Sequence, residues 1–283
     1  MKNCYLCGSR ESTIYRLVNG WQLLLCKNCS LLRTNLSSRN NSLSINRDVY
    51  DKTYVSSYLA RKRELSRRFR KYLDIVETFK QGGVILDIGC GLGFFVEQAN
   101  KSRIHWTAYG VELNEYLTRE ANKELKGQVK VGSLSRIPFP SNYFDCITGF
   151  DVLEHSTEVN KNLQNIHKAL KDDGIVVIQS PNYRSLMRYI SGSFWDWWAL
   201  PDHVIHFSSE TLALALERNG FIVRMIKTYE PLSDFIGNIK QLARKNVFTK
   251  ALFVICLPAL LVNRFIAHKI GCGGLVLVVA QKK

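Results

Sequence analysis

Four cysteines near the start of the chain have the spacing of a metal-binding site. Cys4 and Cys7 form one C-x-x-C pair, and Cys26 and Cys29 form a second pair after eighteen intervening residues. Two such knuckles can present four thiolates to one tetrahedral Zn²⁺, as in a zinc ribbon. Four protein ligands leave no open coordination position, so the predicted zinc is structural rather than catalytic. The alternative is four free or disulfide-bonded cysteines.

The segment between the two pairs is expected to form a small hairpin. It reads TIYRLVNGWQLLL, and its central Asn19-Gly20 is a favoured two-residue turn. Gly8 and Asn28 are expected to allow the tight turns of the knuckles. The other cysteines lie in apolar segments and are expected to be buried thiols: Cys90, Cys146, Cys256 and Cys272.

A second group of residues predicts a ligand-binding loop. The apolar run VILDI at 84–88 suits a buried parallel strand. It leads into Asp87-x-Gly89-x-Gly91-x-Gly93 and then into a helical pattern. Glycines at such a point allow the backbone to turn sharply and to approach a ligand closely.

An acidic residue follows at the end of the next predicted strand. IHWTAYGVELNEYL, 104–117, places Glu112 at the carboxyl end of that strand and a helix start at Asn114. In a doubly wound sheet, a carboxylate at this point accepts hydrogen bonds from ribose hydroxyls. The glycine loop is one residue tighter than the dinucleotide pattern G-x-G-x-x-G, so it departs from that class.

Together these motifs resemble the class I S-adenosylmethionine-dependent methyltransferases. The resemblance rests on VILDIGCGLGFF, YGVELN and FDVLEH and covers roughly residues 60–283. It implies an α/β fold, a Rossmann-like doubly wound seven-stranded sheet with the last strand antiparallel, here with a small N-terminal zinc ribbon. A zinc ribbon ahead of this domain is similar to bacterial methyltransferases of sugar, cell-envelope and natural-product pathways. It is also similar to a group of ribosomal-RNA guanine methyltransferases.

The resemblance implies how S-adenosylmethionine would be held. The loop glycines would lie against its methionine part, Asp87 would orient the loop and the methionine amino end, and Glu112 would hold the ribose. Related enzymes often place an acidic residue near the adenine, but this chain has GSL at 132–134 there. We therefore expect the adenine to contact backbone, Leu113 and Leu134. The expected cofactor-binding residues are Asp87, Gly89, Gly91, Gly93, Glu112, Leu113, Ser133, Leu134 and Asp151.

Histidines follow two predicted strands at the edge where open α/β sheets bind ligands. Asp151-Val-Leu-Glu154-His155 follows the fourth strand, and His203-Val-Ile-His206 lies between the fifth strand and the next helix. Methyl transfer to oxygen usually needs a base with a near-neutral pKa, and histidine is the natural choice. His203 is the first candidate for this base. His155 and Glu154 are the further candidate catalytic residues.

These residues also have alternative roles. Glu154 and His155 could cap and start the following helix, where negative charge is favoured. In a quinone-biosynthesis branch of the family, the matching pattern with Glu at its first position holds a divalent metal. Here Asp151 stands at that position, which leaves a metal site as an alternative. His206 is expected to cap or pack against the helix that starts at 208–210.

The predicted elements divide the chain into three parts. Residues 1–35 are the zinc-ribbon-like segment, the polar stretch 36–58 is a linker, and 59–283 is the methyltransferase domain. Apolar residues recur at helical spacing through 65–79, which predicts an amphipathic helix with a basic outer face. The domain carries an apolar insertion at about 231–270.

The insertion separates the last two predicted strands, FIVRMIKTY at 221–229 and GGLVLVVAQ at 273–281, which should pair antiparallel. It contains ALFVICLPALLV, 251–262, which is shorter than the about 20 apolar residues of a membrane-spanning helix. Either this stretch packs on the domain or on a second copy, or it lies in a membrane interface beside acidic head groups. A separate aromatic loop, FWDWWAL at 194–200, is expected to be a lid or a wall for sugar rings or lipid.

The net charge of +15 favours an anionic partner, although solubility alone could also explain it. No apolar signal segment is present at the N-terminus, so we expect a cytoplasmic protein, with a peripheral position at the inner membrane face as the alternative.

The leading hypothesis is a methyltransferase acting on a sugar or another small-molecule or glycan acceptor, lipid-linked acceptors included. The alternatives are an RNA (rRNA) methyltransferase, for which no RNA-binding motif is recognised, and a non-catalytic SAM-binding protein.

Overall fold

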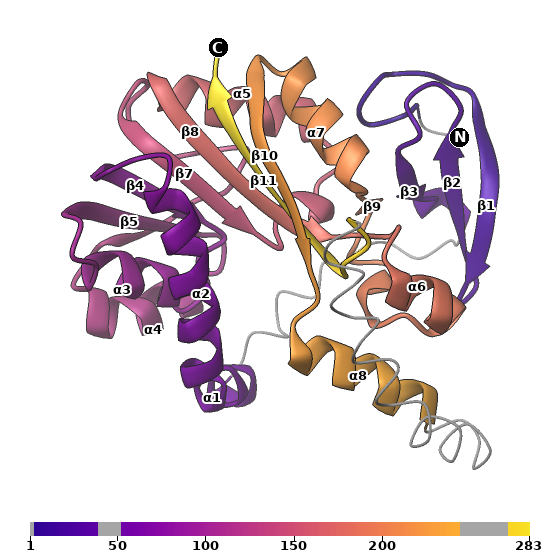
Figure 1. Cartoon of the computed structure of the whole chain (residues 1–283), viewed down its shortest axis with the longest axis horizontal. Coiled ribbons are helices and arrows are strands. Elements are labelled where there is room, and N and C mark those ends of the chain that lie inside the picture. Colours follow the sequence, from indigo (N-terminus) through magenta and orange to yellow (C-terminus); the bar gives the residue numbers. More distant parts are fainter. Residues whose placement is uncertain (1–2, 39–51, 244–270) are drawn as a thin grey trace.

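The computed structural model describes residues 3–38, 52–243 and 271–283, and a seven-stranded sheet is its largest element (Figure 1). The strand order is β10-β11-β8-β7-β4-β5-β6. Its strands are β4 (Gly83–Ile88), β5 (Trp106–Glu112), β6 (Val129–Val131), β7 (Phe144–Phe150), β8 (Leu170–Pro181), β10 (Phe221–Tyr229) and β11 (Leu275–Lys282). All neighbours pair in parallel except β11, which is antiparallel to both β8 and β10. The predicted fold class is therefore confirmed.

Helices cover both faces of this sheet. Ile85 and Leu86 are adjacent in β4 and belong to different cores, as the two-residue period of a strand requires. One core lies under α2 (Lys62–Glu77), α3 (Phe94–Asn100) and α4 (Glu115–Leu125). The other lies under α5 (Val159–Ala169) and α7 (Ser209–Arg218).

The predicted amphipathic helix corresponds to α2, which buries Leu65, Tyr72, Leu73 and Val76. The predicted linker 36–58 is wrong at its end, because a helix, α1 (Lys52–Ala60), begins inside it. The polar composition that suggested a linker ends before α1, whose Val55 packs on the domain.

The cysteine-rich segment contributes three strands to a second sheet: β1 (Ser12–Val18), β2 (Trp21–Cys26) and β3 (Leu32–Thr34). The predicted hairpin is confirmed, because β1 and β2 pair around Asn19 and Gly20, whose φ angles are 48° and 80°. In the second knuckle, Ser30 and not the expected Asn28 adopts the left-handed conformation. Gly8 does so in the first knuckle.

The fourth strand of this second sheet comes from the domain that contains the seven-stranded sheet. It is β9 (Ile205–His206), which pairs antiparallel with β3. Ser208 rather than His206 caps α7, so the expected capping role of His206 is wrong, and the His206 ring is hydrogen-bonded to Thr34. The cysteine-rich segment and the domain thus share a sheet, which Figure 1 shows beside α7.

The start of the predicted insertion is the helix α8 (Leu232–Ala243). Its Asp234 forms an ion pair with Arg68 of α2 at 3.2 Å, and Asn238 accepts a hydrogen bond from the amide of Asp196 at 3.1 Å. The stretch 251–262 lies outside the described residues. Within the described ranges, none of the helices has the length and hydropathy needed to cross a bilayer.

Candidate functional site

The loop between β4 and α3 leaves open space at one of its three glycines. All three have φ in the left-handed region, between 53° and 73°. A Cβ on Gly89 would lie 2.5 Å from Val152, and one on Gly93 would lie 2.3 Å from a leucine of α4. Among the described residues, a Cβ on Gly91 would meet only Tyr58, at 4.0 Å. Gly89 and Gly93 therefore permit close packing, whereas Gly91 borders space that a ligand can occupy.

Glu112 braces this loop from the end of β5. Its Oε2 accepts a hydrogen bond from the amide of Gly91 at 2.9 Å, and its Oε1 accepts one from the amide of Asn114, also at 2.9 Å. Asn114 caps α4, as predicted, by accepting hydrogen bonds from two amides of the first turn. Each carboxylate oxygen has a second lone pair, so Glu112 can still accept hydrogen bonds from a ribose.

The residues expected around the adenine differ in their exposure. Leu113 is 56% exposed beside Glu112, so its side chain is available to a ligand. Leu134 is buried in the core that also contains Val111, and Ser133 is hydrogen-bonded to the hydroxyl of Ser135 at 2.8 Å. Among the side chains expected at the adenine, Leu113 is thus the one most open to contact.

Two carboxyl groups lie at the carboxyl ends of β4 and β7. Asp87 is buried and accepts a hydrogen bond from Thr148 at 2.7 Å, and burial raises its pKa to about 8. Asp151 has a left-handed φ of 56°, and its Oδ1 accepts a hydrogen bond from Gln179 at 2.6 Å. Burial raises the pKa of Asp151 to about 6. Both carboxyls are therefore sensitive to a cation placed near them.

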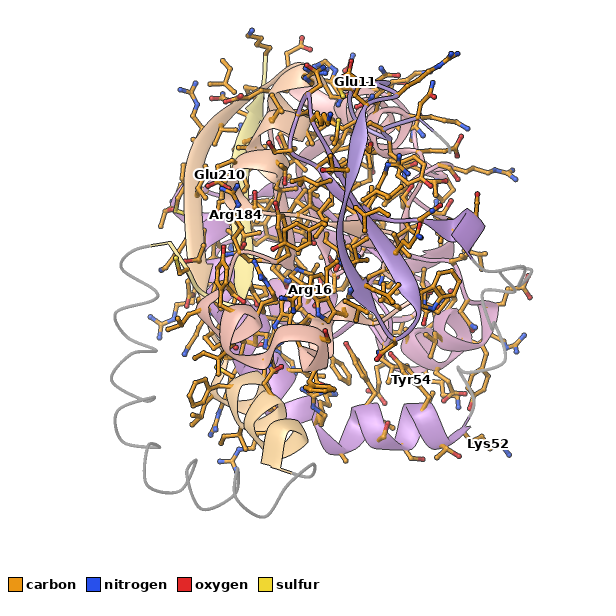
Figure 2. All side chains as sticks on the ribbon, turned by 90° about the vertical axis from the view of Figure 1, so that its right-hand side faces the viewer. Glu11, Arg16, Lys52, Tyr54, Arg184 and Glu210 are labelled. Carbon is orange, nitrogen blue, oxygen red and sulfur yellow. The ribbon has the colours of Figure 1, made fainter. Side chains whose placement is uncertain are left out.

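Aromatic side chains from α1 cover the glycine loop. Tyr58 stacks on Phe94 with ring centroids 5.3 Å apart, and Tyr54 stacks on Tyr58 at 5.7 Å. Figure 2 shows α1 with Tyr54 on the side of the helix that faces the rest of the chain. Sequence reasoning missed this contact, because α1 fell inside the predicted linker. The four-residue spacing of the two tyrosines was the signal for a helix.

A second group of side chains gathers near the ends of β7 and β8. Glu154 and His155 lie in a 3-10 turn, η3 (Leu153–His155), and His203 lies in the loop before β9. One ligand atom from each of these three residues lies within 4.8 Å of the other two. Because α5 begins at Val159, the alternative that Glu154 and His155 start this helix is wrong.

Backbone carbonyls fix the tautomer of both imidazoles. Nδ1 of His155 is 3.0 Å from the carbonyl of Asp202, and Nδ1 of His203 is 2.9 Å from the carbonyl of Trp197. A carbonyl oxygen only accepts hydrogen bonds, so each Nδ1 carries the proton. Each Nε2 therefore keeps a lone pair that can accept a proton or bind a cation.

Burial controls the charge of this group. His203 is buried, and burial together with the neighbouring His155 lowers its pKa to about 3. His155 reaches the surface, although the surrounding protein still lowers its pKa by desolvation. Glu154 is buried, its two oxygens have no hydrogen-bond partner among the described residues, and burial raises its pKa well above the usual range. The two imidazoles are therefore neutral near pH 7, and burial favours the protonated form of Glu154.

This donor set is also one that could hold a divalent cation, because it combines two imidazole nitrogens with a carboxylate. Asp151, the residue that raised this alternative in the sequence, is not part of the group. Its Oδ1 accepts the Gln179 hydrogen bond instead.

The four N-terminal cysteines come together as predicted. Sγ of Cys4 is 3.5 Å from Sγ of Cys29, Sγ of Cys7 is 3.5 Å from that of Cys26, and all four sulfurs lie within 4.8 Å of one another. Bonds of 2.3 Å to a tetrahedral zinc ion would separate the sulfurs by about 3.8 Å, so the four residues fit this metal. No disulfide joins the described cysteines.

The remaining thiols lie elsewhere in the chain. Cys90 and Cys146 are buried as expected, whereas Cys272 is half-buried. Cys256 lies outside the described residues. Of the described cysteines, Cys90, Cys146 and Cys272 therefore contribute no ligand to the N-terminal cluster.

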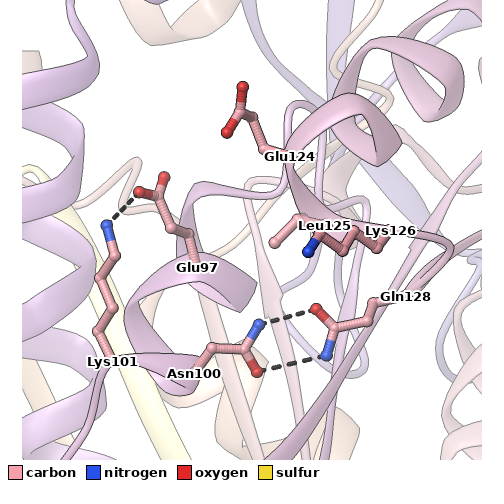
Figure 3. A pocket seen from close by; sticks show the side chains of 7 residues that line it. All are labelled: Glu97, Asn100, Lys101, Glu124, Leu125, Lys126 and Gln128. Carbon is pink, nitrogen blue, oxygen red and sulfur yellow. Dashed lines mark hydrogen bonds and ion pairs between the residues drawn. The ribbon is translucent and has the colours of Figure 1, made fainter.

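A shallow hollow elsewhere on the domain is drawn in Figure 3. It lies where α3 and α4 end. Paired side-chain amides of Asn100 and Gln128 form one wall. The residues that line it are Glu97, Asn100, Lys101, Glu124, Leu125, Lys126 and Gln128. Of these residues, Leu125 is the leucine of α4 that packs at Gly93, and the others belong to none of the groups described above.

Residues 59–226 match a protein family described as "Methyltransferase domain". The match covers more than half of the chain, so the chain belongs to this family, among the class I S-adenosylmethionine-dependent methyltransferases. The fold agrees with this: a SAM-dependent methyltransferase from Archaeoglobus fulgidus superposes with a TM-score of 0.55 at 22% identity, over 82% of this chain and 100% of that chain.

Two relatives are similar in sequence. The ubiquinone/menaquinone biosynthesis C-methyltransferase UbiE of Yersinia pestis (strain Pestoides F) is 31% identical over 178 residues, which cover 59% of this chain and 68% of that protein. Uncharacterized protein MJ1252 of Methanocaldococcus jannaschii is 29% identical over 134 residues, which cover 47% of each protein. The aligned part of the chain thus spans about half the length of the second relative.

Proposed function

We propose that the protein transfers the methyl group of S-adenosylmethionine to a sugar or another small-molecule or glycan acceptor. The observation that carries the proposal is the hydrogen bond between Gly91 and Glu112, with open space beside Gly91, at the carboxyl edge of a methyltransferase-family sheet. This edge is where open α/β sheets bind their ligands.

In this proposal the cofactor lies between the glycine loop and α1. Its methionine part lies along Gly91 under the ring of Tyr58, and its ribose hydroxyls donate to Glu112. The methionine ammonium lies near Asp87 and Asp151, whose raised pKa values a cation would lower again. Leu113 offers its exposed side chain to the adenine.

The acceptor lies beside His155 and His203. Methyl transfer is an in-line displacement, in which the acceptor oxygen bonds to the methyl carbon as the carbon–sulfur bond breaks. Positioning supplies much of the rate, and a base removes the acceptor proton. The sequence placed His203 first for this role. We assign the base to Nε2 of His155, because His155 reaches the surface while burial lowers the pKa of His203 to about 3.

The aromatic loop supports a ring-shaped acceptor. Trp195 and Trp198 are buried and pack at 5.1 Å, as expected of a lid on the core. Trp197 is only half-buried, and its ring lies nearly parallel to that of His203 at 6.4 Å. A half-exposed indole beside the acceptor site can stack on the apolar face of a sugar.

The four cysteines are proposed to hold one structural Zn²⁺.

The net charge of +15 is proposed to serve peripheral contact with an acidic membrane surface, which would bring the enzyme to a lipid-linked acceptor. RNA is the less favoured acceptor, because Arg61, at the N-cap of α2, and several basic residues of α2 form ion pairs within the chain. These pairs are Arg61–Glu64, Lys62–Glu97, Arg68–Asp234 and Arg70–Asp74.

The test is incubation of the purified protein with methyl-labelled cofactor and two separate extracts, total RNA and a glycolipid fraction. We expect label in the glycolipid fraction. Label in RNA alone would contradict the proposed acceptor, and no label in either, with no binding of the cofactor, would contradict methyl transfer itself.

A further inference from the structure

The loop that carries His203 is held between the cysteine-rich segment and the turn that carries His155. On one side, the carbonyl of Val204 accepts a hydrogen bond from the amide of Thr34 at 2.9 Å. On the other side, the amide of Val204 donates to the carbonyl of Glu154 at 3.0 Å. The pairing of β3 with β9 continues this contact along the chain. Val204 thus contacts both the cysteine-rich segment and the turn that carries His155.

The hydroxyl of Thr34 adds two contacts to this loop. It donates to the carbonyl of His203 at 2.8 Å and lies 3.0 Å from Nε2 of His206. Its one proton goes to the carbonyl, so the hydroxyl accepts from His206 and that Nε2 carries a proton. Thr34 is fully buried. Loss of this hydroxyl would leave the imidazole N–H of His206 without its acceptor in a buried place, which is costly.

The second cysteine knuckle determines the position of Thr34. The amide of Cys26 donates to the carbonyl of Leu31 at 3.0 Å, and Leu31 and Leu32 are fully buried. Strand β3 therefore follows the knuckle with no flexible connection, and Thr34 lies five residues after Cys29. A change in the knuckle is transmitted to Thr34 through this short buried strand.

We propose that the cysteine-rich segment is a positioning element for the acceptor site and that Thr34 is its positioning residue. Thr34 acts through the backbone of His203 and the ring of His206, and it touches neither cofactor nor acceptor. The catalytic consequence rests on the methyltransferase function proposed above. The glycine loop, where the cofactor is proposed to bind, lies elsewhere at the sheet edge. Loss of the knuckle should therefore disturb the acceptor site and leave the cofactor site unchanged.

The first test compares Thr34→Val, which removes the hydroxyl and keeps the shape, with Thr34→Ser, which keeps the hydroxyl. Thr13→Val in the exposed part of β1 is the matched control. In protein labelled at histidine side chains, NMR signals of His203 and His206 should shift in Thr34→Val and return in Thr34→Ser. Methyl transfer should fall about tenfold in Thr34→Val, the cost of one lost hydrogen bond, with cofactor affinity unchanged.

The second test needs no substitution. Zinc is removed from the wild-type protein with a chelator, and amide hydrogen exchange is compared at 203–206 and at 88–94. We expect faster exchange at 203–206 and unchanged exchange at 88–94. Uniform change in both segments, or unchanged histidine signals in Thr34→Val, would overturn the proposal. Neither readout uses an acceptor, so a failure of the proposed function, seen as absent methyl transfer by the wild type, is a separate result.

Discussion

The amide of Gly91 donates a hydrogen bond to Oε2 of Glu112, and the 2.9 Å contact joins the glycine loop after β4 to the end of β5. The carboxylate proposed to hold the ribose therefore also fixes the loop proposed to approach the methionine part of the cofactor. In the proposed complex one side chain therefore serves both the ribose and the methionine part of the cofactor, and its loss should lower cofactor affinity.

Replacement of Glu112 by alanine should weaken cofactor binding about 10- to 100-fold, since hydrogen bonds to a charged group contribute about 1.5–3 kcal/mol. Isothermal titration calorimetry with S-adenosylmethionine measures this directly. Glu115→Ala is the control, because Glu115 is exposed in the first turn of α4. Unchanged affinity in Glu112→Ala would reject the ribose contact.

Gly127 serves as the control for Gly91, because both glycines have a positive φ. Gly91 has a φ of 53° and Gly127 one of 88°, and an added Cβ meets at most one atom, 4.0 Å away at Gly91. Either Gly→Ala variant should lose about 1–2 kcal/mol of folding stability from the left-handed backbone. We expect only Gly91→Ala to lose cofactor affinity as well, because its methyl group enters the ligand space. Equal affinities in the two variants would place the cofactor elsewhere.

The cysteine cluster should bind one zinc ion per chain. Elemental analysis of purified protein measures the ratio, and Cys29→Ser should lower it while Cys272→Ser should not. Metal content well below one zinc per chain in the wild type would reject the ribbon. Release of zinc should also lower the melting temperature, because a structural zinc site contributes its binding energy to folding.

The raised pKa of Asp87 predicts that the stability of the cofactor-free protein depends on pH. Burial raises its pKa to about 8, whereas the unfolded chain has about 3.9. Between these values the native state holds a proton that the unfolded state has released, so this group lowers stability progressively as pH rises from about 4 to 8. Urea denaturation at pH 5 and pH 8 should show a smaller loss in Asp87→Asn than in the wild type.

The control for that experiment is Asp172→Asn, because the Asp172 side chain is 94% exposed. This variant should follow the wild type at both pH values. If Asp87→Asn has the same pH dependence as the wild type, then Asp87 is ionised in the native protein and the burial argument is wrong.

His155 is the proposed base, so His155→Ala should lower turnover about 10²- to 10⁴-fold, the usual contribution of a general base. Cofactor affinity should stay unchanged, because His155 lies on the acceptor side. His167→Ala, which replaces a half-buried histidine of α5, is the control and should keep full turnover. A larger loss in His203→Ala than in His155→Ala would return the base to His203.

Local sequence patterns predicted those structural features that depend on residues close together in the chain. The apolar run at 84–88 and the glycines after it gave a strand and its loop, and Asn19-Gly20 gave the hairpin. Glu112 and the helix cap Asn114 were found in the same way. These features could be predicted because strand periodicity, turn conformation and helix capping are properties of a few consecutive residues.

The sequence could not predict which histidine is the more accessible one in the proposed acceptor site. His203 and His155 each follow a predicted strand, and their residue types are the same. Only the packing of Trp197 and the surrounding loop buries His203 and leaves His155 at the surface. Burial decides which imidazole can take a proton, and burial depends on residues that are distant in the chain.

The sequence by itself determined the class of sheet, the cofactor loop and the cysteine cluster, because each is encoded in short-range spacing. Only the tertiary structure decided that α1 covers the loop with Tyr58 and that Thr34 joins the cysteine-rich segment to His203. The pairing of β3 with β9 involves very short strands more than 160 residues apart, such as Leu32 with His206. Strands this short have no periodicity of their own, so the packing of the whole chain determines their partner.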